Sequence, residues 1–257
     1  MLITDIHAHV YPDRIAEKAA QSIGAFYNLP VSASGTVSEL LTHKKISRFV
    51  VHSVATAPAQ VSSINSFIAA SAAENPRFVG FGAMHPDFPD FEAETERIIS
   101  LGLRGLKLHP DFQRFDIDDP KMFPLYALLE GRLPLLLHCG DPRLDHSAPE
   151  RVAAVCRRFP RLTVIGAHFG GWSLFLRAAE VLSEVDCYVD TSSSLMFMEP
   201  GDARALIRKF GPERVLFGSD YPMWKPGEEV DRLLGLGLTD EEYEKIFYKN
   251  ADELLKN

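Results

Sequence analysis

The sequence has few cysteines and no long apolar segment. Its three cysteines, Cys139, Cys156 and Cys187, are widely spaced and form no CxxC pair. An odd number of cysteines at such spacing suggests neither a disulfide framework nor a thiolate metal site. No apolar stretch approaches the roughly 18 residues that a membrane-spanning helix needs, and the N-terminus has no basic leader. We therefore expect a cytoplasmic protein with no membrane partner.

The chain also lacks blocks of like charge. Lys and Arg number 27 against 35 Asp and Glu, which gives 257 residues a formal net charge of -8. Without a basic patch, nucleic acid is not an expected partner. The 46% hydrophobic and 24% charged residues are typical of a globular protein with a sizeable core.

Short apolar runs recur along the chain, each followed by a longer segment of helical periodicity. The predicted strands are residues 2–10, 47–54, 78–84, 103–109, 133–139, 162–168, 186–191 and 214–219. The predicted helices include residues 57–74, 88–101, 121–131, 149–159, 172–184 and 201–210, with closing helices over 240–257. Residues 28–36 are predicted to form a loop.

The alternation of strands and helices indicates a parallel sheet. Several strands are apolar on both faces, as in LPLLLHC at 133–139, so they should be covered on both sides, as in a closed barrel. An open doubly wound sheet is the competing fold, and it would favour a glycine-rich turn after the first strand, where the sequence has DIHAH at 5–9. The sequence therefore predicts an α/β fold, a single-domain (β/α)8 TIM barrel over residues 1–257.

Histidines gather at the C-terminal ends of the predicted strands. Five of the nine are there: His7, His9, His109, His138 and His168. Active sites of (β/α)8 enzymes are built at this end of the barrel, so the bias indicates a site. A single histidine at a strand end is more often structural than a ligand, but the set together favours a metal centre. The other histidines are expected to be structural or solvated: His52, His85, His43 and His146.

The first strand carries two potential metal ligands. Side chains alternate along a strand, so His7 and His9 share one face, and Ile6 and Ala8 should meet the helices. Two imidazole nitrogens at about 2.0–2.2 Å can bind a divalent metal, and a carboxylate oxygen suits the same ion.

Two residues further along complete the predicted metal site. Asp220 follows the last strand and is the natural carboxylate, while His138 ends an apolar run where packing does not explain an imidazole. The sequence therefore predicts a metal site made of His7, His9, His138 and Asp220.

Five ordered motifs carry a family resemblance. They are DIHAH at 5–9, GLKLHP at 105–110, LHCG at 137–140, GAHFGG at 166–171 and FGSDYP at 217–222. Over nearly its whole length the chain resembles the amidohydrolase superfamily, in particular the branch of aminocarboxymuconate semialdehyde decarboxylase and related decarboxylases. The resemblance implies a homodimer and one divalent ion, zinc first or else manganese. It also implies metal ligands at His7, His9, His138 and Asp220, with His168 nearby as an acid/base group.

The resemblance leaves the reaction open. The first expectation is hydrolysis of a small-molecule amide, ester or lactone by a metal-activated water, with Asp220 accepting the water's proton and His168 stabilising charge on the carbonyl oxygen. The alternative is non-oxidative decarboxylation of an aromatic or unsaturated carboxylic acid at the same site. A non-catalytic metal-binding scaffold is a third hypothesis, which the full ligand set disfavours.

Two candidate substrate-binding residues share the fourth strand. Lys107 is expected to be a free amine that holds substrate or packs against Asp5; the alternative is a carbamate bridging two metals, as in binuclear branches of the superfamily. His109 either contacts substrate or caps its strand.

The remaining candidates lie in loops at the same end of the barrel. A decarboxylase is expected to bind its carboxylate with an arginine, because the guanidinium fork matches a carboxylate. Arg143 and Arg114 are the candidates. Trp224 and Trp172 would wall an aromatic or apolar substrate.

Overall fold

The strands of the computed structural model, which describes residues 1–256, all pair in parallel. Asn257, the last residue of the predicted closing helices, lies outside the described part. The strands are β1 (Thr4–His9), β2 (Arg48–His52), β3 (Phe78–Gly80), β4 (Gly82–Ala83), β5 (Leu106–Leu108), β6 (Leu135–Leu137), β7 (Val164–Gly166), β8 (Tyr188–Asp190) and β9 (Val215–Leu216). Because only Phe81 separates β3 from β4, the two fill one strand position, and each predicted strand is found.

Backbone hydrogen bonds join the two sheets into a barrel. Ile6 N donates to Phe217 O at 2.9 Å and His9 N donates to Tyr221 O at 2.7 Å, so β1 meets the segment that begins with β9. On the other side, Phe81 N donates to Val51 O at 2.9 Å. The expected (β/α)8 barrel is confirmed.

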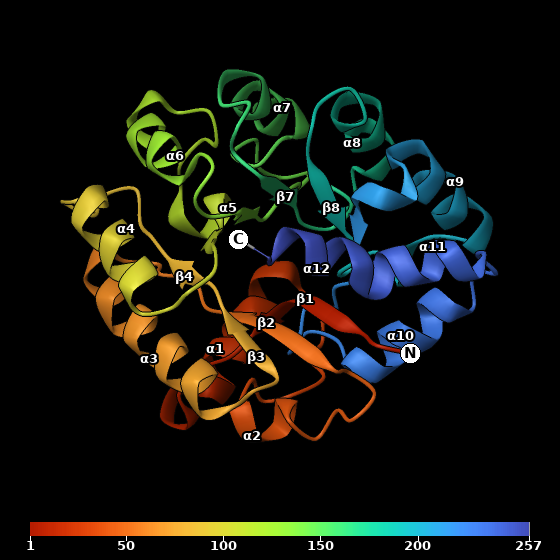
Figure 1. Cartoon of the computed structure of the whole chain (residues 1–257), viewed down its shortest axis with the longest axis horizontal. Helices are drawn as coiled ribbons and strands as arrows, with labels where there is room; N and C mark the ends of the chain where they lie inside the picture. Colours follow the sequence, from red (N-terminus) through yellow and green to blue (C-terminus); the bar gives the residue numbers. More distant parts are fainter. Residues whose placement is uncertain (257) are drawn as a thin grey trace.

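Helices surround the strands, with α3, α4, α6, α7, α8 and α9 around the rim in Figure 1. The helices are α1 (Asp13–Tyr27), α2 (Val37–Leu40), α3 (Val61–Glu74), α4 (Phe91–Ser100), α5 (Pro110–Gln113), α6 (Phe123–Leu129), α7 (Pro149–Arg158), α8 (Phe175–Leu182), α9 (Pro200–Phe210), α10 (Pro226–Leu234), α11 (Asp240–Glu244) and α12 (Asn250–Leu254). Proline opens α7, α9 and α10, where its missing N–H is no loss. None of the helices in residues 1–256 has the length and apolar character of a membrane span.

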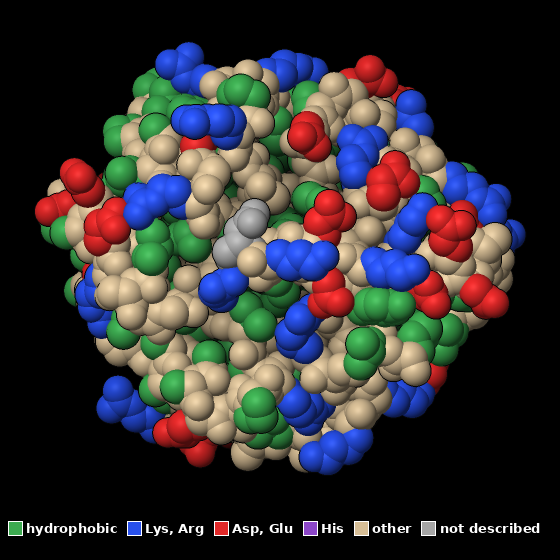
Figure 2. Space-filling view, viewed as in Figure 1, with side chains coloured by type: hydrophobic (Ala, Val, Ile, Leu, Met, Phe, Trp, Pro, Cys, Tyr) green, Lys and Arg blue, Asp and Glu red, His purple; other side chains and the backbone are tan. Residues whose placement is uncertain are grey.

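A small apolar cluster fills the barrel interior, with residues from several different strands. It consists of Ile6, Val50, Phe81, Leu136, Ile165, Ala167, Leu216, Ala251 and Leu254. The last two belong to α12, which crosses the barrel end that faces the viewer in Figure 1. Figure 2 shows the same face in space-filling form, with acidic and basic side chains interspersed.

The prediction for Ile6 is wrong, and a bulge in β1 explains why. Asp5 pairs with Phe49 and Ala8 pairs with Val51, so three steps along β1 match two along β2. An extra residue in one strand re-aims its side chains. Ile6 therefore joins the interior cluster, while Ala8 packs in the outer core as predicted.

Candidate metal centre

Three of the four predicted metal ligands meet at the C-terminal end of the barrel. His7 Nε2 lies 3.3 Å from His9 Nε2, and Asp220 Oδ1 lies 3.4 Å from each of these nitrogens. The two histidines are buried. Two imidazole nitrogens and a carboxylate oxygen directed at one point are a donor set for a divalent metal.

The orientation of His7 is set by Asp190 at the end of β8. Asp190 Oδ2 accepts a hydrogen bond from His7 Nδ1 at 2.8 Å, which leaves the lone pair of Nε2 directed at the other ligands. The other carboxylate oxygen of Asp190 accepts from the backbone N–H groups of His168 and Ser192, each at 3.0 Å. We did not predict Asp190 as a site residue, although the polar run DTSSS at 190–194 directly follows a predicted strand.

His138 and His168 form a second pair beside this cluster. His138 Nδ1 lies 3.0 Å from His168 Nε2, and His138 Nε2 lies 3.2 Å from Gly140 O. His168 Nδ1 in turn lies 2.8 Å from Ser192 Oγ. If His138 Nε2–H donates to the Gly140 carbonyl, Nδ1 of His138 keeps a free lone pair beside His168. The structure thus places the fourth predicted ligand next to His168 rather than in direct contact with His7.

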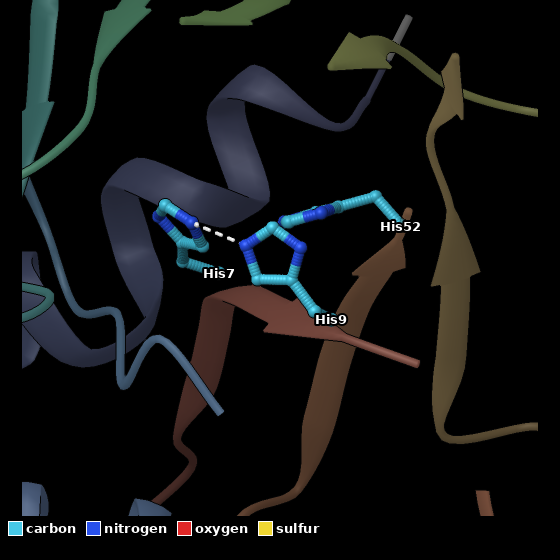
Figure 3. A group of neighbouring side chains, drawn as sticks. All are labelled: His7, His9 and His52. Atoms are coloured by element: carbon cyan, nitrogen blue, oxygen red, sulfur yellow. Dashed lines mark hydrogen bonds between the residues drawn. The ribbon is translucent and has the colours of Figure 1, made fainter. Parts of the chain in front are cut away.

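His52 belongs to the cluster, which the sequence did not suggest. Figure 3 shows its ring directed from β2 toward His7 and His9 of β1. The ring centroid of His52 lies 4.4 Å from that of His9 and 5.1 Å from that of His7. The three residues offer nitrogens within 4.8 Å of one another, a spacing that could hold a metal ion. Within the described part, neither ring nitrogen of buried His52 has a hydrogen-bond partner, nor has Nδ1 of His9.

Burial and charge favour the ligating forms of these residues. Burial lowers the pKa of His7, His9 and His138, so the rings stay neutral and keep a lone pair. Burial alone would raise the pKa of Asp220, but the neighbouring His7 and the hydrogen bond from His9 hold that pKa below its ordinary value. Asp220 therefore stays ionised.

The backbone at the site is held in an uncommon conformation. Asp220 and His168 each have φ of 60°, and Ser193 has φ of 48°. The left-handed region is sparsely populated by residues other than glycine, and such conformations cluster at functional sites.

Lys107 was predicted to hold substrate or to pack against Asp5, and within residues 1–256 its side chain makes no hydrogen bond or ion pair with Asp5. Its Nζ lies 3.2 Å from His7 Nε2, whereas Asp5 accepts hydrogen bonds from Ser219 N and Ser219 Oγ at 3.0 and 2.5 Å. Burial lowers the pKa of Lys107 to about 8. The lysine thus faces the metal cluster as a readily deprotonated amine.

His109 caps the helix that follows its strand, while its contact with substrate stays a prediction. It is the N-cap of α5, and its Nδ1 accepts a hydrogen bond from Phe112 N at 3.4 Å. Its Nε2 lies 3.1 Å from the phenol oxygen of Tyr27, which is also 3.1 Å from His138 Nε2. We did not predict Tyr27, because no helix was expected between the first two strands.

Arg143 does not line the cavity above the cluster. Its guanidinium donates to Asp141 at 2.9 and 2.6 Å and to Phe26 O at 2.8 Å, and it lies over the ring of Tyr27. Arg143 therefore braces the end of α1 from outside. No arginine in residues 1–256 lines that cavity, so the arginine expected to hold a carboxylate there is not present.

The cavity above the cluster is small and has aromatic walls. Its volume is about 30 Å³, and Tyr27, Phe112 and Trp172 are among its lining residues. Trp224 contributes indirectly, since its Nε1 donates to Ser193 Oγ at 2.8 Å and Ser193 lines the cavity.

A family model and a curated relative match this chain. The model of the family described as Amidohydrolase matches residues 4–256. The 2-amino-3-carboxymuconate-6-semialdehyde decarboxylase of Dictyostelium discoideum is 24% identical in an alignment 243 residues long that covers 75% of this chain. The chain spans 65% of the length of that relative.

Solved structures show the same fold. An uncharacterised TIM-barrel protein from Bordetella bronchiseptica has a TM-score of 0.81 at 22% identity, covering 99% of this chain and 98% of that one. The 5-carboxyvanillate decarboxylase of Novosphingobium aromaticivorans, complexed with manganese and 4-hydroxy-3-methoxy-5-nitrobenzoic acid, has a TM-score of 0.78 at 15% identity, covering 100% of this chain and 96% of that one.

Proposed function

The chain belongs to the amidohydrolase family, and on that premise we propose that it is a metal-dependent decarboxylase of an aromatic or unsaturated carboxylic acid. It is an enzyme of a family that contains metal-dependent hydrolases and decarboxylases. Hydrolysis of an amide, ester or lactone, our first expectation, is supported only at the level of the family. The decarboxylase alternative has closer support, because the curated relative and the Novosphingobium structure both carry that name.

The aromatic wall beside the cluster is the structural observation that carries the proposal. The ring of His109 is stacked between Phe112, at 3.7 Å between centroids, and His138, at 3.9 Å, with interplanar angles of 5° and 7°. Both faces of the His109 ring are covered in this stack, so the aromatic rings that line the cavity, Tyr27, Phe112 and Trp172, are the ones that a planar acid would contact. A conjugated acid suits this wall better than a flexible amide does.

The donor set fits a divalent ion. His7, His9 and Asp220 would hold it, with His138 as the fourth ligand, and this mixture of nitrogen and oxygen donors suits zinc or manganese. When bound, the ion would attract substrate oxygens and draw electron density from the reacting carbon.

Side chains of the protein would transfer the proton that the reaction requires. A decarboxylation converts R–COO⁻ and H⁺ into R–H and carbon dioxide, so one proton must reach the carbon that loses its carboxylate. Asp220 and His168 both line the cavity and are held in place, Asp220 by the hydroxyl of Ser193 at 2.5 Å and His168 by Ser192. We assign the proton relay to these two side chains: Asp220, which is ionised, first takes up a proton from solvent and then passes it to the carbon.

The test is carbon dioxide release from a panel of aromatic and unsaturated acids, together with metal analysis. We expect one class of acid to lose carbon dioxide and Asp220→Asn to slow this by roughly 10³-fold, the scale of lost acid–base catalysis. The exposed carboxylate variant Asp202→Asn should react at the wild-type rate. About one metal per chain, lost in His7→Ala, is expected.

Three results would contradict the proposal. Near-normal turnover in Asp220→Asn would remove the proton role of that residue. Hydrolysis of lactones or amides, with no acid decarboxylated, would restore the hydrolase hypothesis. Two metals per chain would make Lys107 a bridging carbamate in a binuclear site.

A further inference from the structure

A large groove lies between α1 and α3, next to the metal centre. Its volume is about 870 Å³, and we call it the α1–α3 groove. It shares His9, Ile23 and Phe112 with the cavity above the cluster. That cavity, at about 30 Å³, matches the share of one water molecule, whereas ligand pockets for small organic molecules reach several hundred Å³. Of these two spaces, the groove is the larger and has room for the body of an organic substrate.

The groove has apolar walls on both sides. Residues four apart on α1, Ile15, Ala19 and Ile23, line it, and Ile64 and Phe67 of α3 line the facing side. An apolar helix stripe normally packs against another element of the protein. The side chain of Ile15 is instead 45% exposed. The stripe therefore offers contact area to an apolar ligand.

Cations are gathered at the same groove. Arg14 and Lys18 on α1 and Arg114 after α5 line it, and within residues 1–256 none of the three has a carboxylate partner at ion-pair distance. The chain has a net charge of -8, but the lining of this groove contains three cations and one acid, so the groove is locally positive. Their field favours an anionic ligand.

Buried polar atoms without partners also belong to the lining of the groove. Asp111, the acidic residue among the lining side chains, accepts from Ser147 Oγ at 2.6 Å through Oδ2, but its buried Oδ1 has no partner. The buried Nδ1 atom of His9 also has no hydrogen-bond partner within residues 1–256. Buried polar groups are usually hydrogen-bonded, so two of the residues that line the groove carry a polar atom without its usual partner.

We propose that the α1–α3 groove binds the body and far end of the substrate, which is an elongated acid with an apolar body and a second anionic group. The reacting carboxylate reaches the cluster past His9, the body lies along the apolar walls, and the second anion meets Arg14, Lys18 and Arg114. The assignment of the reacting end rests on the proposed function; the binding of an apolar dianion does not.

Two probes that differ only in the second anion test the groove. Biphenyl-4,4′-dicarboxylate and biphenyl-4-carboxylate share a rigid apolar body, and isothermal titration of the metal-loaded protein gives the Kd of each. We expect the dicarboxylate to bind about tenfold more tightly, because several weak exposed charge contacts add. The preference should shrink as salt is added.

Variants test which residues cause the tighter binding of the dicarboxylate. The triple variant Arg14→Gln, Lys18→Gln and Arg114→Gln should bind the two probes equally, and Lys209→Gln, an exposed lysine on α9, should keep the tenfold ratio. If the triple variant does not fold, Arg114→Gln alone should lower the ratio about threefold. Equal binding by the wild type, or a ratio that survives the triple variant or falls equally in Lys209→Gln, would overturn the groove assignment.

The groove assignment and the proposed reaction can be tested independently of each other. Asp220→Asn should keep the probe preference even though it loses turnover, since Asp220 does not line the groove. A charge-dependent preference in a protein that decarboxylates nothing would leave the groove standing and the reaction wrong. If the protein decarboxylates single-ring acids but binds the two probes equally, the proposed reaction stands and the groove assignment is wrong.

Discussion

The two ends of the barrel are built from the same strands but in opposite ways. At the end covered by α12 (Figure 1), Ile6, Val50, Leu136 and Leu216 pack with Leu254 into an apolar cluster. At the other end, buried histidines and carboxylates contact one another. One end therefore supplies packing and the other supplies chemistry, a division usual in (β/α)8 enzymes.

The polar end shows features that cost stability. Left-handed backbone occurs there at His168, Ser193 and Asp220, and buried His52 has two ring nitrogens without partners. Each such feature costs on the order of 1–3 kcal/mol. We therefore expect substitutions at the apolar end to lower stability without changing metal binding, and substitutions at the polar end to change metal binding.

The largest effect on stability is expected at the apolar end. Leu136 is fully buried, so Leu136→Ala leaves a cavity and should lower the free energy of unfolding by about 2–5 kcal/mol. Denaturant unfolding measures this loss, and elemental analysis should show unchanged metal content. A loss of metal at equal stability would show that the two ends are not independent.

At the polar end, one substitution is expected to raise the free energy of unfolding by a similar amount. Burial lowers the pKa of Lys107 from 10.5 to about 8, so the folded state holds the charged amine at a cost. The unfolded chain binds more protons between pH 8 and 10.5, so this cost is full below pH 8 and disappears as the pH rises through that window. Lys107→Met should therefore be more stable than wild type at pH 7, by about 3 kcal/mol at 1.36 kcal/mol per pKa unit.

The pH dependence distinguishes this cause from a general packing gain. The stability difference between Lys107→Met and wild type should shrink from pH 8 to pH 10, while the exposed control Lys209→Met should show no such trend. A difference that is constant with pH would mean that Lys107 is not charged at neutral pH. Fewer metals in Lys107→Met than in wild type would instead indicate the bridging carbamate.

The fold was largely predictable from the sequence because its signals are local. Apolar runs such as 133–139, followed by segments of helical periodicity, mark the strand–helix units. The bulge at Ile6 was not predictable, since it depends on the register between β1 and β2. Helix α1 was not among the predicted helices, although Ile15, Ala19 and Ile23 recur in it at helical spacing.

The site was predictable where a residue ends a strand. Side chains at the C-terminal ends of parallel barrel strands converge, and His7, His9 and Asp220 meet in this way. Asp190 also lies at the end of a strand and contacts His7, but we did not predict it. Tyr27 could not be found in this way, because α1 brings it to His109 and His138 from a distant part of the chain. Contacts across the mouth depend on how a loop or helix folds over the barrel.

The smallest of these effects concerns Asp190, which contacts a predicted ligand without being one. Its carboxylate accepts the hydrogen bond of His7 Nδ1, and Asp190→Asn weakens that bond and loosens the ring orientation. Loss of such an orienting partner typically costs 10–100-fold in metal affinity, about 1.4–2.7 kcal/mol. Competition with a chelator of known affinity measures this loss, with Asp202→Asn as the exposed control. Unchanged affinity in Asp190→Asn would mean that His7 is held by the barrel backbone alone, and the polar end would then owe its geometry to the same packing as the apolar end.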